Sequence, residues 1–270
     1  MMRATAAEGS RVLTAAAAKR RNQREREQLL AEAALFRLIA QAFSYPEPEL
    51  VCSVRRNTLE LAAAAMRGEL APALAPALRA LGRAWRTAPA QGLAIEYSRL
   101  FLGAGLVPLR EGGYGGGLRF AGQPVDIADL NGFYLAFGFA LSESAPNPPD
   151  HLGAEIEFVS LLHLKKAHAL ERGRARDARI VDHALGRFLE DHLGRWVPSL
   201  EAALREAEAS APYAILAEVM KKAVTAECTR LGVKPHLARR GTADDPIGGD
   251  ALVCPLAMAE RAAESTRSEQ

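Results

Sequence analysis

The residues best suited to chemistry lie in one short stretch, Pro149-Asp150-His151-Leu152, followed by Glu155. His151 and Glu155 are four residues apart, so on a helix they share a face and could share a metal ion. The sequence offers no second ligand pair to complete such a site, and no Glu-x-x-His motif of the kind that carboxylate-bridged di-metal bundles use. We therefore predict no metal site and interpret Asp150 as a helix N-cap.

Other catalytic patterns are also missing from the sequence. Cys52, Cys228 and Cys254 are widely spaced and form no Cys-x-x-Cys pair, which favours a reducing compartment. There is no Gly-x-Ser-x-Gly elbow, and the glycines of residues 112–117 match neither dinucleotide-binding nor Walker A spacing. The sequence thus identifies no catalytic residue, and we predict a protein that is not an enzyme and needs no cofactor.

Composition favours a soluble, helix-rich globular protein. Alanine makes up about a fifth of the 270 residues and aromatic residues only 6%, a balance that favours helices over strands. The net charge of +2 is too small to attract nucleic acid. The longest apolar run, residues 133–141, is about half of a bilayer span, and the basic N-terminal residues lack the apolar stretch of a signal peptide. We expect a cytoplasmic protein without a membrane span.

The elements that would position these residues are helices. Apolar residues recur at three- and four-residue steps from Glu25 to a stop at Pro46, which predicts a core helix there. Similar patterns predict helices over 49–67, 73–87, 91–102, 124–141, 152–171, 175–208 (bent or broken at Pro198) and 212–231. No strand-like alternation is found between hairpin turns. The sequence predicts an all-α fold, a single-domain bundle of about eight to ten helices.

Breaks in the helical pattern suggest how the chain is organised. Residues 1–25 lack an apolar face and are expected to be a flexible tail. Residues 103–122 are rich in glycine and favour a surface loop, whereas three prolines make residues 141–150 a candidate hinge. The helical domain is expected over 26–231, and residues 232–270 form a C-terminal tail of unknown role.

Four short segments, in this order, complete the sequence signals. They are Glu96-Tyr97-Ser98-Arg99-Leu100-Phe101, Phe133-Tyr134 with Gly138, Pro149-Asp150-His151-Leu152 with Glu155 and Phe158, and Phe188-Leu189-Glu190-Asp191-His192-Leu193-Gly194-Arg195-Trp196-Val197-Pro198. Together they resemble the TorD/DmsD family of redox enzyme maturation chaperones, over about residues 30–231. In the loop between the first two segments, only Pro108 and Tyr114 match the family pattern.

The resemblance implies a TorD-like chaperone for the catalytic subunit of a molybdopterin oxidoreductase of the dimethyl sulfoxide reductase type. Such chaperones bind the twin-arginine leader or the apo form of that subunit and hold it until its cofactor is inserted. A receptor for two guanidinium groups beside an apolar run needs an apolar groove with carboxylates at one end. Asp126 and Asp129, across the loop from Asp150 and Glu155, would add negative charge.

The candidate site residues form two sets. The expected peptide-binding set is Tyr97, Leu100, Phe101, Tyr114, Pro149, Asp150, His151 and Glu155. The set expected to be structural is Tyr134, Gly138, Phe158, Phe188, His192 and Trp196. For Leu100 and Phe101, a groove wall and plain core packing are both open. The indole of Trp196 and the imidazole of His192 are expected to satisfy buried acceptors.

Two other classes of function remain open from the sequence. One is a helical regulatory or scaffolding module that binds a partner helix unrelated to export. The other is an enzyme that binds a nucleotide or another small molecule. We expect a mainly monomeric protein, with a domain-swapped dimer as the alternative because the glycine-rich loop joins two helical halves.

Overall fold

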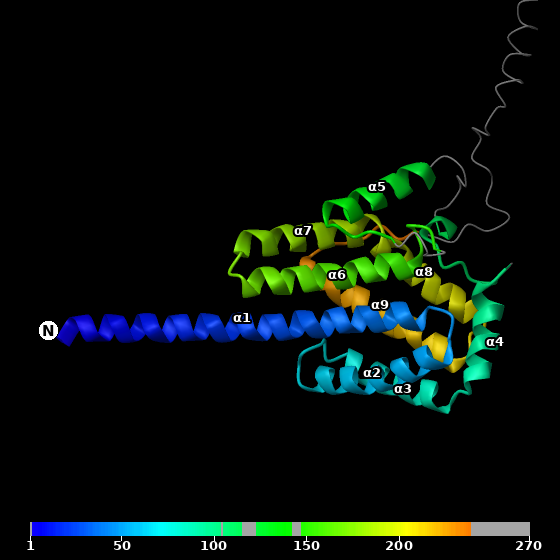
Figure 1. Cartoon of the computed structure of the whole chain (residues 1–270), viewed down its shortest axis with the longest axis horizontal. Coiled ribbons are helices and arrows are strands. Elements are labelled where there is room, and N and C mark those ends of the chain that lie inside the picture. The colour runs from blue at the N-terminus through cyan, green and yellow to red at the C-terminus, as the bar shows by residue number, and fades with distance from the viewer. Residues whose placement is uncertain (1, 104, 115–122, 142–146, 239–270) are drawn as a thin grey trace, which may run out of the picture.

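The computed structural model describes residues 2–103, 105–114, 123–141 and 147–238, and their side chains from residue 20 onward except those of 123–126. Within these ranges the chain forms nine α-helices, one 3₁₀ turn and no strand, which confirms the predicted all-α fold (Figure 1). The elements are α1 (Met2–Ala42), α2 (Pro48–Met66), α3 (Leu74–Thr87), α4 (Ala90–Phe101), η1 (Glu111–Gly113), α5 (Gln123–Ala136), α6 (Leu152–Glu171), α7 (Ala175–Asp191), α8 (Leu193–Glu206) and α9 (Ala211–Leu231).

The longest helix, α1, has 41 residues and is therefore about 60 Å long. Phe36, Ile39 and Phe43 lie buried on it, and it packs against α6, α2 and α9. Its N-terminal part extends beyond the other helices (Figure 1). The structure differs here from the flexible tail expected over residues 1–25. An alanine-rich segment has high helix propensity even without an apolar face, so the helix continues back to Met2.

The other helices surround the C-terminal part of α1. Helices α6 and α7 pair along one side of it, and α2 and α3 pair along another (Figure 1). Helix α9 packs on α3 and α8, and α4 crosses the end of the bundle (Figure 1). None of the helices within the described ranges combines the length and hydrophobicity needed to cross a bilayer.

Two helix ends differ from the sequence prediction. The break expected at Pro198 occurs at His192, and Pro198 lies in the second turn of α8, where a proline costs one helical hydrogen bond. Helix α5 ends at Ala136, earlier than expected, because Gly138 adopts a left-handed φ of 63°. The amide of Phe139 then donates to the carbonyl of Tyr134 at 2.8 Å, which closes the helix end.

Aromatic rings fill the core between α5, α6 and α7. The ring of Phe158 lies 5.0 Å from that of Tyr134 and 4.8 Å from that of Phe188, and all three residues are buried. The Tyr134 hydroxyl donates to the carbonyl of Pro149 at 2.9 Å. This bond ties α5 to the chain just before α6, which is where the candidate site lies.

Candidate functional site

The start of α6 lies next to a short segment, residues 147–151, that we call the hinge segment. Here His151, and not Asp150 as predicted, is the N-cap, and its Nδ1 accepts from the amide of Gly153 at 3.1 Å. Burial, helped by the charge of Arg110, lowers the pKa of His151, which favours the neutral ring that can accept this bond. The buried Asp150 carboxylate instead pairs with Arg110, whose Nη2 lies 3.0 Å from Oδ1.

The hinge segment is paired with residues 107–114, the loop segment. The amide of Glu111 donates to the carbonyl of Asp150, and the amide of Leu152 donates to the carbonyl of Leu109, both at 2.9 Å. These two bonds form an isolated antiparallel bridge. The Arg110–Asp150 ion pair is therefore supported by backbone bonds on both sides.

Glu155 lies one turn into α6 and is completely buried. Its Oε2 accepts from the indole Nε1 of Trp196 at 3.1 Å, and the Trp196 ring stacks on Tyr114 at 5.3 Å. Its Oε1 has no hydrogen-bond partner among the described residues. Burial, followed by the charges of Glu111 and Asp150, raises the pKa of Glu155 well above its usual value. Glu155 is therefore protonated at neutral pH and provides no negative charge to a ligand in this arrangement.

His192, at the break between α7 and α8, joins two carboxylates. Its Nδ1 lies 3.1 Å from Glu111 Oε2, and its Nε2 lies 3.0 Å from Asp129 Oδ2. Burial alone would lower the pKa of His192, but hydrogen bonds and charges from Glu111 and Asp129 outweigh burial and raise it. The imidazolium form links the loop segment to α5, and the Asp129 side chain remains 59% exposed.

The α4 residues of the predicted binding set lie in a different aromatic cluster. The Tyr97 ring is 5.0 Å from that of Phe101, which is 5.6 Å from the ring of Tyr213. The Tyr97 hydroxyl donates to the carbonyl of Phe43 at 3.3 Å. Leu100 is fully buried, whereas Phe101 is half-buried. Leu100 therefore packs in the core, and only Phe101 leaves much of its ring accessible.

The predicted binding residues thus fall into two places. The hinge and loop segments and the first turn of α6 hold Tyr114, Pro149, Asp150, His151 and Glu155, and the end of α4 holds Tyr97, Leu100 and Phe101. Sequence reasoning missed Arg110 and Glu111, although a charged pair inside a glycine-rich loop was a signal that could have identified them. Asp126, also expected to supply charge, lies outside the side chains that the structure describes.

This all-helical fold, with a polar network around the start of α6, matches a known class of protein. The model of the nitrate reductase delta subunit family matches residues 67–202, which include the loop segment, the hinge segment and His192. The chain belongs to this family. The match confirms the resemblance to redox enzyme maturation chaperones that the four segments indicated.

Three curated proteins are similar to part of the chain. The chlorate reductase assembly chaperone protein of Ideonella dechloratans is 33% identical over 113 residues, 42% of this chain and 56% of that protein. The selenate reductase assembly chaperone protein of Thauera selenatis is 34% identical over 106 residues, 39% of this chain and 53% of that protein. The perchlorate reductase assembly chaperone protein of Dechloromonas aromatica is 31% identical over 104 residues, 38% of this chain and 46% of that protein. The chain spans about half the length of these relatives.

Proposed function

We propose that this protein is a cytoplasmic assembly chaperone for the catalytic subunit of a molybdopterin oxidoreductase of the dimethyl sulfoxide reductase type. It binds the twin-arginine leader or the apo form of that subunit, holds it until the cofactor is inserted, and catalyses no reaction. It acts mainly as a monomer. Family membership supports this proposal, as do three relatives that are each named for the assembly of a reductase.

The observation that carries the proposal is the Arg110–Asp150 ion pair. The Asp150 side chain is 3% exposed, and the side chain that covers it, Arg110, is 44% exposed. Asp150 therefore already binds a guanidinium group at the protein surface, through charge-assisted hydrogen bonds of the strong type that carboxylates make with arginine. A leader arginine that replaces Arg110 would find the same carboxylate, with Asp129 exposed nearby through their shared neighbour Glu111.

The apolar part of the leader would lie over the end of α4. Phe101 is half-buried there, and the next residues along the chain include Leu102 and Leu106, which are 48% and 46% exposed. These side chains precede the loop segment directly, so a single extended or helical peptide could contact both regions. In this arrangement Leu100 supports the surface from below.

Calorimetric titration with a synthetic twin-arginine leader peptide of a reductase catalytic subunit tests the proposal. Asp150→Asn should weaken binding at least tenfold, because the neutral amide loses the charge-assisted bonds to an arginine. Arg110→Gln should tighten binding, because it removes the internal competitor. The matched control is Asp177→Asn, which alters the surface Arg174–Asp177 pair on α7 and should leave affinity unchanged.

Replacement of both leader arginines by lysine should abolish binding to the wild-type protein, because lysine lacks the planar fork that pairs with a carboxylate. Equal affinity of wild type, Asp150→Asn and Arg110→Gln would contradict the proposed site. Failure to bind any leader or apo-subunit would favour a scaffolding module that binds an unrelated helix. Circular dichroism of each variant separates lost binding from lost folding.

A further inference from the structure

A second polar cluster lies in the centre of the bundle, away from the hinge segment. It contains Glu32 of α1, His163 of α6 and Glu227 of α9. His163 Nε2 lies 3.4 Å from Glu32 Oε2 and 3.3 Å from Glu227 Oε2. One ligand atom from each residue falls within 4.8 Å of the other two. Helices from both ends of the chain thus bring one nitrogen and two oxygen ligands to a common point.

The imidazole of His163 is oriented as in a metal ligand. It is fully buried, stacks on Phe36 with ring centroids 5.4 Å apart, and its Nδ1 lies 2.8 Å from the carbonyl of Val159. A proton on Nδ1 makes that bond and leaves the Nε2 lone pair directed at the carboxylates, the arrangement that backbone carbonyls impose on metal-binding histidines. Among the described residues, Nε2 has no hydrogen-bond partner of normal geometry.

The separations also fit a metal ion. Ligand atoms about 2.0–2.1 Å from a tetrahedral zinc ion are about 3.3–3.4 Å apart, and the two nitrogen–oxygen distances here are 3.3 and 3.4 Å. One nitrogen and two oxygen ligands suit zinc and its neighbours among the divalent transition metals better than magnesium or calcium, which prefer oxygen alone. Three protein ligands leave a fourth position open.

The charges around the cluster leave room for a dication. Lys166 pairs with Glu25 at 3.1 Å and with Asp182 at 2.8 Å. Arg230 pairs with Asp182 at 3.1 Å and with Glu227 at 2.8 Å. With Glu32, four carboxylates therefore face two permanent cations, and a neutral His163 leaves two negative charges to be compensated.

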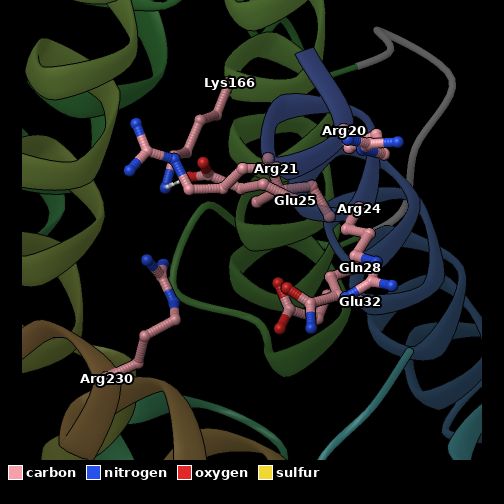
Figure 2. Close-up of a pocket in the computed structure, with 9 residues that line it drawn as sticks. Arg20, Arg21, Arg24, Glu25, Gln28, Glu32, Lys166 and Arg230 are labelled. Atoms are coloured by element: carbon pink, nitrogen blue, oxygen red, sulfur yellow. Dashed lines mark ion pairs between the residues drawn. The ribbon is translucent and has the colours of Figure 1, made fainter. Parts of the chain in front are cut away.

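A pocket of about 660 Å3 gives access to the cluster from the surface. Glu32, Lys166 and Arg230 project toward it from three helices (Figure 2). Its outer wall on α1 carries arginines, which repel cations and weaken the affinity for a metal. The arginines of this wall are Arg20, Arg21 and Arg24.

We propose that Glu32, His163 and Glu227 bind one divalent transition-metal ion of the zinc class, with an open coordination position toward this pocket. The ion would connect α1, α6 and α9. This site is independent of the proposed chaperone function, because Glu32 and Glu227 lie outside the residues that the family model matches.

Calorimetric titration of the chelator-treated full chain with zinc chloride tests the site. The wild-type protein should bind one equivalent saturably, and Glu32→Gln should weaken that binding at least tenfold because a ligand is lost. Glu25→Gln is the matched control: it removes the same charge from the same pocket but no ligand, and binding should persist within about threefold. Cobalt(II) in place of zinc should give the intense visible absorption of a four-coordinate site in the wild type only.

Glu32 is the ligand least dependent on packing, since its side chain is 20% exposed, so Glu32→Gln is expected to fold. Should His163→Gln fold as well, it must also lose the zinc isotherm. Zinc should raise the melting temperature of the wild type and of Glu25→Gln but not of Glu32→Gln. Absence of saturable binding, or equal zinc affinity in wild type and Glu32→Gln, would overturn the proposal and identify the cluster as a histidinium ion pair.

Discussion

Replacement of Glu155 by glutamine should change how the stability of this protein depends on pH. Glu155 is completely buried, and its pKa in the folded protein is raised well above the usual 4.5 by burial and by the charges of Glu111 and Asp150. Glutamine has nearly the same shape and keeps an oxygen to accept from Trp196 Nε1, but it does not titrate. The comparison therefore isolates one proton.

The sign follows from which state holds that proton. Above pH 4.5, the unfolded chain has lost the Glu155 proton while the folded protein retains it, so rising pH favours unfolding. The wild-type free energy of unfolding should fall, relative to that of Glu155→Gln, by up to about 1.4 kcal/mol for each pH unit until the folded pKa is reached. At pH values below 4.5 the difference should become constant, because both states are then protonated.

Urea unfolding of both proteins at pH 5, 6 and 7 measures this effect. The difference between the two free energies should shift steadily in favour of Glu155→Gln as the pH rises. Glu60→Gln, at an exposed position on α2, should run parallel to the wild type over the same range. Parallel curves for wild type and Glu155→Gln would show that Glu155 is ionised in the folded protein, and the reasoning from its burial would then be refuted.

Two further changes test the local structure around the site, and both are measured as free energies of unfolding in urea. His151→Ala removes the acceptor for the Gly153 amide and should cost about 1 kcal/mol, whereas His151→Asp should retain the cap; equal stability of both variants would contradict the assigned N-cap. Gly194→Ala should destabilise strongly, because a Cβ atom there would lie 2.3 Å from the backbone oxygen of Leu189. Gly132→Ala, in α5 with open space around the added carbon, should instead stabilise by about 0.5–1 kcal/mol, and a loss at both glycines would argue against the close approach at Gly194.

The helices were predictable because their signals are local. Apolar periodicity and the prolines near residue 46 located the end of α1, and the pattern after residue 151 located α6 from Leu152 to Glu171. The partner of a polar residue was not predictable in this way. Asp150 and His151 are both good N-cap types, and the choice between them depends on Arg110, forty residues earlier in the chain.

The same limit applies to groups that meet across helices. Periodicity indicates that Leu100 or His163 lies on an apolar face, but not which helix that face meets. The break at His192 depends on Glu111 and Asp129, so the nearby Pro198 gave the wrong position for it. For Glu32, His163 and Glu227, no spacing in the sequence indicates that three separate helices converge.

The backbone bonds between the loop and hinge segments have a consequence for how a passenger protein would be released. The Arg110–Asp150 contact and the amides of Glu111 and Leu152 join the same two stretches of chain, so these contacts should break and re-form cooperatively. A passenger that displaces the Arg110 guanidinium would hold this clasp open at a continuous energetic cost. As the passenger folds and its own arginines become engaged elsewhere, re-closure of the clasp would supply part of the free energy that ejects it.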